Sequence, residues 1–233
     1  SAFHNNKRLV HVEAGLRTFD KTSPFPEESY RCMISKMADY HFCPTDTARF
    51  NLNKENITKG VYVVGNTIVD TFRDVIPDSR FPYKNYLLVT LHRRENRGPK
   101  MIRMWEQLNK IVDYNIVYIT HPSLPEARDH LTCTLLEPQD YSSMISLIMN
   151  SRGIISDSGG LQEEAVCAKK KILVCRDTTE RPETITSGWG LLVDDNIIDN
   201  VSFFEDGIVS GLDNIYGENV SKKIVKELVN DYC

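Results

Sequence analysis

The hydrophobic positions along the chain fall into two alternating patterns. Short apolar runs of strand length are separated by longer segments whose apolar residues recur at helical spacing. The predicted strands are Arg8–Val12, Val61–Val64, Leu87–Thr90, Ile116–Ile119, Gly153–Ser156 and Ile172–Cys175. The predicted helices include Glu27–Met37, Thr45–Asn53, Met101–Val112, Tyr141–Met149 and Leu161–Cys167. Such alternation is typical of βαβ units and a mostly parallel sheet, which binds ligands at the carboxyl ends of its strands.

A domain boundary is predicted near Gly60–Asn66, where a short strand ends and a new helix begins. The residues before it contain only one clear strand, which is too little for an independent α/β domain, so the front of the chain looks incomplete. At the other end, Glu218–Tyr232 is predicted to be an amphipathic helix, with Val220, Ile224 and Leu228 on one face and Val225 as a further candidate for it.

Composition narrows the possible partners. The net charge of -4 argues against nucleic acid as the main partner. No apolar run approaches the roughly 20 residues that span a bilayer, so no membrane partner is expected. The six cysteines form no CxxC pair, which favours reduced thiols and a cytoplasmic location over disulfides or a metal site.

The first candidate site is Ser156-Asp157-Ser158-Gly159-Gly160, which follows a predicted strand and opens a helix. Small residues at a helix start leave backbone N–H groups free at the positive end of the helix dipole. Together these suit an anion such as a diphosphate. The alternative is an ordinary helix cap whose glycines allow tight packing.

The second candidate is the turn Leu91-His92-Arg93-Arg94-Glu95-Asn96 after the strand Leu87–Thr90. A histidine and two arginines at the carboxyl end of a strand are well placed for anionic groups, because arginine binds phosphate through two hydrogen bonds. The alternative is a solvated basic turn paired by Glu95.

A third candidate joins HVEAGLR, which contains Glu13, to PFPEE, which contains Glu27 and Glu28. Acids in the first turn of a helix complement its dipole, and that structural role is one interpretation of Glu27 and Glu28. The other is that Glu13 and one of the pair converge as carboxylates tuned for general acid and base catalysis.

Two weaker candidates also follow predicted strands. The loop RDTTERPE carries Arg181, a possible ribose or phosphate contact, although charge runs often serve only solvation. His121 ends another strand. The sequence holds neither convincing metal-ligand spacing nor a dinucleotide or P-loop fingerprint, so no metal and no cofactor are expected.

The sequence from Arg8 to Val193 resembles the non-hydrolysing UDP-N-acetylglucosamine 2-epimerases. The resemblance lies in a set of motifs that occur in the same order: HVEAGLR, PFPEE, LHRREN and DSGGLQEEA with RDTTERPE. The resemblance implies an α/β, GT-B-like fold in which a cleft between two Rossmann-like domains holds the UDP-sugar. It also implies cofactor-free elimination and re-addition of UDP. The implied domains are 1–65, a remnant of the N-terminal domain, 66–205, the UDP-binding domain, and 206–233, a helical segment returning to the N-terminal part.

The resemblance also assigns roles to individual residues. Glu13, Glu27 and His92 are the implied catalytic residues, and His121 is a candidate for a second, allosteric UDP-sugar site. The implied substrate-binding residues are Arg94, Gln139, Met144, Ser158, Gly159, Gly160, Glu164 and Arg181. Many relatives have an aromatic residue where Met144 stands.

Chains of that family begin well upstream, with an Arg-Pro loop and a catalytic aspartate that this sequence lacks. We therefore expect the C-terminal two-thirds of such an enzyme, weakly active or inactive alone. It is expected to bind UDP and a UDP-sugar, as a homodimer or with a separate N-terminal chain. Alternatives stay open at two levels. As an epimerase, the chain could act on a related UDP-6-deoxy-hexosamine or hydrolyse its substrate. It could instead be a non-catalytic UDP-binding module or a GT-B glycosyltransferase.

Overall fold

The computed structural model describes residues 2–76, 81–205 and 215–230. It divides the chain into two compact units, each described by itself. Unit 1 comprises Ser1–Arg73 and Asp213–Cys233, and unit 2 comprises Asp74–Leu212. The predicted C-terminal segment 206–233 lies partly outside the described residues, which resume at 215.

Unit 1 is built on a three-stranded parallel sheet in the order β1-β2-β3. Its strands are β1 (Val10–Val12), β2 (Tyr40–Cys43) and β3 (Val61–Val63). Its helices are α1 (Glu27–Met37), α2 (Asp46–Lys54), α9 (Val220–Asn230) and the 3-10 turn η1 (Phe3–Asn5), and α3 (Ile68–Asp74) runs to the unit boundary. Strand β2 was not predicted from the sequence, so the predicted count of one clear strand before the boundary is wrong.

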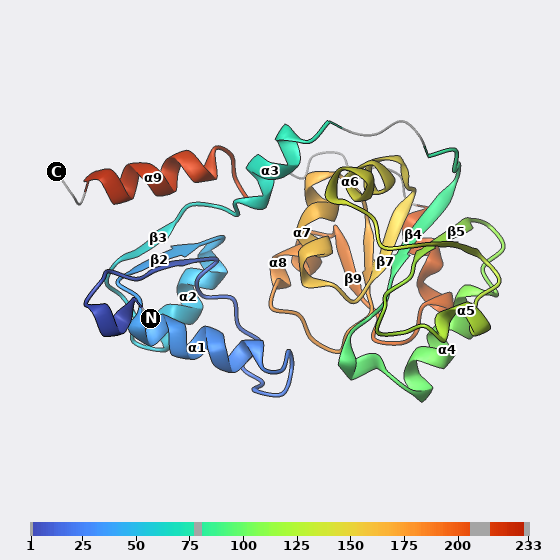
Figure 1. The fold of residues 1–233 in the computed structure, drawn as a ribbon, viewed down its shortest axis with the longest axis horizontal. Helices are drawn as coiled ribbons and strands as arrows, with labels where there is room; N and C mark the ends of the chain where they lie inside the picture. Colours follow the sequence, from blue (N-terminus) through green and yellow to red (C-terminus); the bar gives the residue numbers. More distant parts are fainter. Residues whose placement is uncertain (1, 77–80, 206–214, 231–233) are drawn as a thin grey trace. The chain divides into compact units, whose positions relative to one another are not determined.

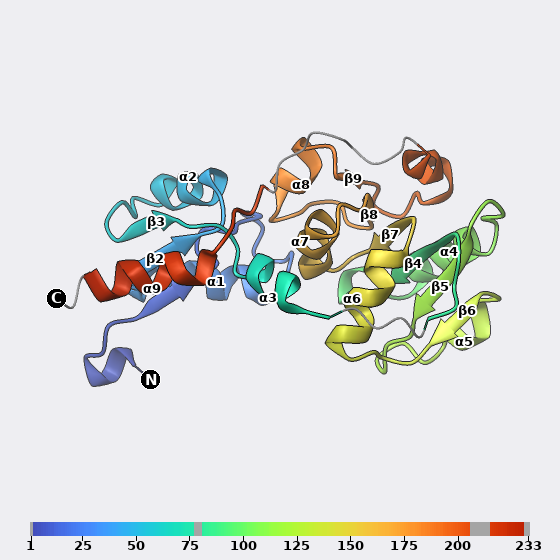
Figure 2. The same cartoon turned by 90° about the horizontal axis from the view of Figure 1, so that it is seen from above.

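Helices cover both faces of β2. Tyr40 and Phe42 point to one face and pack against Val220 and Ile224 of α9. Figure 2 shows α9 beside the strands of this sheet. Cys43 points to the other face and packs with residues of α2. Because all four residues of β2 are buried, the strand lacks the alternation of polar and apolar residues that marks a half-exposed strand. The predicted apolar face of the C-terminal helix is confirmed for Val220, Ile224 and Leu228, whereas Val225 is 58% exposed and does not belong to it.

Unit 2 holds a six-stranded parallel sheet in the order β6-β5-β4-β7-β8-β9. Its strands are β4 (Tyr86–Thr90), β5 (Asn115–Ile119), β6 (Thr134–Leu136), β7 (Gly153–Ser156), β8 (Ile172–Val174) and β9 (Gly190–Leu192). Its α-helices are α4 (Pro99–Leu108), α5 (Ala127–His130), α6 (Tyr141–Asn150), α7 (Gly159–Cys167) and α8 (Pro182–Thr186). Two 3-10 segments, η2 (Arg94–Asn96) and η3 (Ile198–Phe204), complete it.

Alternate residues of β4 face opposite layers of helices. Leu87 and Val89 belong to the core cluster that includes Trp105 of α4. Tyr86 points the other way and donates a hydrogen bond to the carbonyl of Leu147 in α6. Helices α6 and α7 therefore lie on the face away from α4 (Figure 1), and strands buried on both faces read as the continuous apolar runs of the sequence.

The strand order of unit 2 reverses between β4 and β7. From β4 the chain steps outward through β5 and β6, then returns to place β7 on the other side of β4 and continues to β8 and β9. In open parallel sheets, ligands bind outside the carboxyl ends of the strands at such a switch point. The segments after Thr90 and Ser156 both begin there, because these two residues are register partners.

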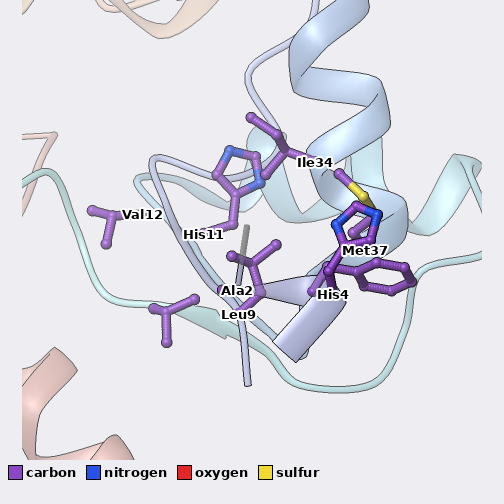
Figure 3. Close-up of a pocket in the computed structure, with 9 residues that line it drawn as sticks. Ala2, His4, Leu9, His11, Val12, Ile34 and Met37 are labelled. Atoms are coloured by element: carbon purple, nitrogen blue, oxygen red, sulfur yellow. The ribbon is translucent and has the colours of Figure 1, made fainter. Parts of the chain in front are cut away.

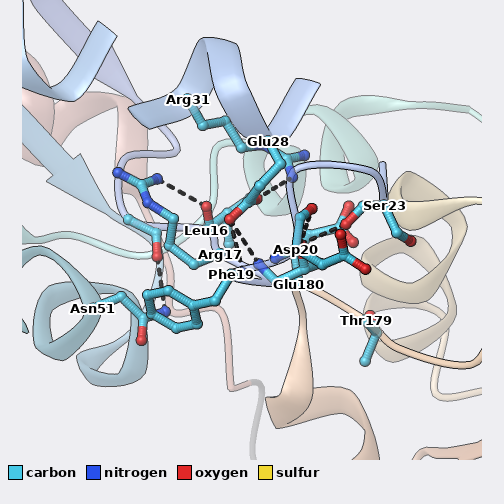
Figure 4. A network of polar contacts seen from close by, with 12 residues as sticks. Leu16, Arg17, Phe19, Asp20, Ser23, Glu28, Arg31, Asn51, Thr179 and Glu180 are labelled. Carbon is cyan, nitrogen blue, oxygen red and sulfur yellow. Dashed lines mark hydrogen bonds and ion pairs between the residues drawn. The ribbon is translucent and has the colours of Figure 1, made fainter. Parts of the chain in front are cut away.

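A buried polar network fixes the loop after β1 (Figure 4). The Arg17 side chain donates to Glu55 Oε1 at 2.6 Å, to the carbonyl of Leu16 at 2.9 Å and to Ser35 Oγ at 2.9 Å. Gly15 lies at φ +85°, and a Cβ there would meet the carbonyl oxygen of Ala48 at 2.1 Å. Glycine is therefore required at this position, since other residues rarely adopt that conformation.

We predict that Arg17→Met lowers the free energy of unfolding of unit 1 by about 3 kcal/mol. This is the low end for breaking a buried ion pair, because Glu55 is partly exposed. Native-state hydrogen exchange of the β2 amides measures the effect. Fluorescence reports unit 2 separately, because both tryptophans, Trp105 and Trp189, lie there.

Arg49→Met is the matched control. Arg49 pairs with Asp46 at 2.7 Å, but both side chains are more than half exposed, and exposed pairs contribute less than about 1 kcal/mol. Equal losses in the two variants would show that the Arg17 network does not hold the loop.

Candidate functional site

The carboxyl ends of β4 and β7 are joined by side chains as well as by the sheet. Thr90 Oγ1 and Ser156 Oγ lie 2.7 Å apart and share a hydrogen bond. Ser156 Oγ also accepts a hydrogen bond from the backbone N–H of Ser158 at 3.0 Å. The start of α7 is thereby tied to the end of β4.

Asp157 lies at the centre of this junction. Its carboxylate is fully buried and accepts hydrogen bonds from the backbone N–H of His92 at 3.0 Å, that of Arg93 at 2.9 Å and the Asn96 side chain at 3.0 Å. The same Asn96 amide donates to the carbonyl of Cys175 after β8. A buried charge persists only when it is paired and hydrogen-bonded, so Asp157 fixes the His92 turn relative to α7.

Ser158 is the N-cap residue of α7, and its side chain makes no capping hydrogen bond. The first N–H groups of a helix have no partner inside the helix and lie at the positive end of its dipole. A Cβ on Gly159 would lie 2.5 Å from Arg181 Nη1. At Gly160, by contrast, no heavy atom of the described chain lies within 4 Å of a Cβ position. Gly159 is thus needed for packing, whereas Gly160 opens on free space.

His92 lies at the same junction and is held on two sides. Its Nδ1 is 3.6 Å from Asp157 Oδ1, and its ring stacks on that of His121 with centroids 4.9 Å apart and planes at 16°. Burial lowers the pKa of His92, the Asp157 charge opposes that shift, and His121, Arg93 and Arg97 add to it. His92 is therefore neutral at pH 7 and able to accept a proton.

Glu164 lies one helical turn into α7 and is half-buried. Burial raises its pKa to about 7, against the effect of a hydrogen bond with Tyr141. Tyr141 begins α6, the helix that carries the half-buried Met144, and Gln139 precedes it. The Gln139 side chain donates to the carbonyl of Glu137 at 2.7 Å. The structure thus places Tyr141 beside Glu164, a contact that sequence reasoning missed.

The two predicted arginines differ in surroundings. Arg94 is exposed in η2. Arg181 is buried and donates to Glu163 Oε1 at 2.5 Å and to Glu180 Oε1 at 2.6 Å. Its guanidinium also lies against Gly159, so the contacts of Arg181 shape the start of α7.

The predicted acids lie in unit 1. Glu13 follows β1 at φ +60°, the left-handed region that residues other than glycine seldom occupy and that is enriched at functional sites. Glu27 is exposed at the start of α1. Its neighbour Glu28 is buried and accepts the backbone N–H groups of Thr18 and Phe19. The two neighbours therefore have different roles: Glu28 stabilises a loop through hydrogen bonds, whereas the Glu27 side chain is exposed.

An apolar pocket of about 490 Å³ lies beside β1 (Figure 3). It is lined largely by hydrophobic side chains, including Leu9, Ile34 and Met37. Burial lowers the pKa of His11, which also lines it, to about 4. The pocket contains none of the predicted site residues, and its largely apolar wall does not suit a diphosphate.

Metal sites and membrane-spanning helices are both absent from the described part of the chain. Across 2–76, 81–205 and 215–230, the structure contains no group of three His, Cys, Asp or Glu side chains arranged to hold a metal ion. In the same ranges, no helix has the length and apolar character to cross a membrane.

Asp157 and Asn96 were not predicted as site residues, and the sequence pattern around each of them is a weak signal. Asp157 stands between two serines in the phosphate motif, and Asn96 ends the basic turn. Each is a short polar residue after a strand, which is common in any α/β protein. Only the register of β4 with β7 shows that one carboxylate serves both segments.

Comparison with known proteins adds to this geometry. The family model described as UDP-N-acetylglucosamine 2-epimerase matches residues 1–229. The enzyme of that name from Salmonella borreze is 38% identical over 230 residues, covering 86% of this chain and 61% of its own length. The chain therefore spans about three-fifths of that relative.

Solved structures give the same result. A crystal structure described as a putative UDP-N-acetylglucosamine 2-epimerase from Listeria monocytogenes aligns with a TM-score of 0.89 at 34% identity, covering 99% of this chain and 69% of that one. The Neisseria meningitidis UDP-GlcNAc 2-epimerase, crystallised with UDP-GlcNAc, aligns with a TM-score of 0.86 at 34% identity, covering 98% of this chain and 71% of that one. The predicted α/β, GT-B-like fold class is confirmed. With a family model matched over nearly its whole length, the chain belongs to the UDP-N-acetylglucosamine 2-epimerase family.

Proposed function

We propose that the chain binds the UDP part of UDP-N-acetylglucosamine at the switch point of unit 2. We also propose that Glu13 and Glu27 serve its conversion to UDP-N-acetylmannosamine. One observation carries the proposal: Asp157 holds the His92 turn and the start of α7 together at adjacent strand ends. The relatives' names, and the UDP-GlcNAc in the Neisseria structure, support the choice of substrate.

The diphosphate is proposed to lie at the start of α7. The free N–H groups near Gly159 and Gly160 supply hydrogen bonds, and the helix dipole supplies positive potential. Ser158 adds a hydroxyl that makes no capping bond. His92 approaches from the neighbouring strand end, and the exposed Arg94 adds charge from η2.

The nucleoside is proposed to lie between α6 and α7. Glu164 accepts hydrogen bonds from the ribose hydroxyls, a role that requires its ionised form. Met144 and Gln139 frame the uracil, with a thioether contact in place of an aromatic stack. Arg181 keeps Gly159 in place through the packing described above, in addition to the ligand contact expected from the resemblance.

The proposed reaction is redox-neutral. A base takes the proton from carbon 2 while the bond between carbon 1 and the diphosphate oxygen breaks, and UDP leaves with the electron pair. The resulting glucal is protonated on the opposite face of carbon 2, and the UDP oxygen attacks carbon 1 again. Two carboxylates, Glu13 and Glu27, suit the two faces. The α7 dipole stabilises the charge on UDP, and His92 does so once it has accepted a proton.

We predict that Gly160→Ala raises the dissociation constant of UDP about tenfold, or ~1.4 kcal/mol. The new methyl group occupies the space assigned to the diphosphate. Stability should not fall, because the methyl group meets no protein atom and alanine favours a helix over glycine by up to about 1 kcal/mol. Calorimetry with UDP and thermal unfolding measure the two effects.

Gly159→Ala gives the contrasting pattern, a loss of stability through its clash with Arg181. Unchanged UDP affinity in Gly160→Ala would contradict the phosphate site. Proton NMR of wild-type samples with UDP-N-acetylglucosamine follows the appearance of UDP-N-acetylmannosamine. Because the chain is expected to be weakly active or inactive alone, binding without product is compatible with both the epimerase and the non-catalytic UDP-binding module, whereas any product formed would exclude the module.

Glu164 gives a pH-dependent prediction. Its pKa of about 7 in the free protein means that a proton occupies the carboxylate in much of the population at neutral pH. Ribose hydroxyls require the ionised form, so affinity for UDP-N-acetylglucosamine should rise about fourfold from about pH 6.5 to about pH 8.5. The ligand does not titrate there, because both its phosphates are esterified.

Glu164→Gln should bind more weakly and show a flat profile over the same pH range. Calorimetry of both proteins at matched ionic strength measures the effect. A wild-type affinity that falls with rising pH, or an identical slope in Glu164→Gln, would remove Glu164 from the ribose site.

A further inference from the structure

The imidazole rings of His92 and His121 form a near-parallel stack, with centroids 4.9 Å apart and planes at 16°. His92 follows β4 and His121 follows β5, and the two strands are parallel neighbours in the sheet. The stack therefore joins the turn after β4, which carries His92, to the carboxyl end of β5. It covers one face of the His92 ring, whose other constraint is Asp157.

The His121 ring is itself fixed by a local turn. Its Nδ1 accepts the backbone N–H of Ser123 at 3.1 Å and lies 2.7 Å from Ser123 Oγ. A backbone N–H only donates, so Nδ1 of His121 must be the acceptor, and the ring proton of the neutral form lies on Nε2. One tautomer and one ring orientation are thereby selected.

We infer that His121 is a positioning residue for His92: the His121 ring holds the His92 ring in place and limits the access of solvent to it. With Nδ1 turned toward Asp157, Nε2 of His92 is the atom presented to a ligand. The stack fixes the direction of that nitrogen, and a stable direction matters because small misplacements of a reacting group reduce rates strongly.

The charged groups that face His92 are consistent with this role. Asp157 raises the pKa of His92, whereas burial, His121, Arg93 and Arg97 lower it, with burial the largest cause. Removing the His121 ring exposes the ring of His92 to solvent and removes one of the groups that lower the pKa of His92. Both changes act in the same direction and raise its pKa.

This inference rests on the proposed function only in assigning the diphosphate to His92. It differs from the second UDP-sugar site that the resemblance implies for His121, because it needs no second ligand. The stack is tested without any nucleotide, so its failure is separable from failure of the proposed function.

The experiment is an NMR titration of the full chain with isotope-labelled histidine, with the six histidines assigned by single substitutions. In His121→Ala the pKa of His92 should rise, and its ring protons should lose the ring-current shift of the stack. His121→Phe restores a stacking ring, so both values should return most of the way to wild type.

His130→Ala is the matched control. His130 is also exposed and stacks on a ring, that of Trp105, at 5.3 Å and 23°, but it lies apart from the site. It should leave the pKa of His92 unchanged. An unchanged pKa in His121→Ala, or an equal rise in His121→Ala and His121→Phe, would overturn the role of the stack.

Adding UDP to the wild-type sample then tests the proposed function separately. A shift of the His92 signals on binding is expected if the ring contacts the diphosphate. A confirmed stack with no UDP-induced shift would keep the positioning role for the ring and remove the nucleotide from the site.

Discussion

The buried carboxylate of Asp157 is the constraint on which the rest of the site depends. An ionised group without solvent is stable only when donors surround it, and here two backbone N–H groups and one amide converge on it. These donors all belong to the turn after β4, whereas Asp157 belongs to the segment after β7. One carboxylate therefore joins two neighbouring strand ends.

The two units contribute different kinds of order. In unit 2 the site is built on strand ends and a helix start, so its geometry follows from the sheet register. In unit 1 the loop that carries Glu13 depends on side chains instead: Arg17 and the glycine at Gly15 hold it from within. Glu13, at φ +60°, lies in this same loop, so a structural arginine and a proposed catalytic acid belong to one segment.

Much of the fold could be predicted from hydrophobic pattern, because buried parallel strands are continuous apolar runs and the helices between them are amphipathic. β2 escaped detection because Tyr40-His41-Phe42-Cys43 is short, contains a histidine and is buried on both faces. The short edge strands β6 and β9 gave too little pattern to be detected.

The site was predictable as a set of segments but not as a set of contacts. Motifs placed His92, Ser158 and Gly160 after strands, and the register then brought those strand ends together. The division of labour between Glu27 and Glu28, and the pairing of Arg181 with acids, depend on side-chain directions that spacing does not encode. The same holds for the contact between Tyr141 and Glu164.

Amide hydrogen exchange in Asp157→Asn tests the central claim most directly. Asparagine keeps the shape but places an N–H donor among donors, so the His92 and Arg93 amides should lose protection, and UDP binding should weaken with them. Asp70→Asn, which removes a carboxylate that accepts the Ser221 N–H in unit 1, should leave both unchanged. Full protection of the His92 amide and wild-type UDP affinity in Asp157→Asn would contradict the account.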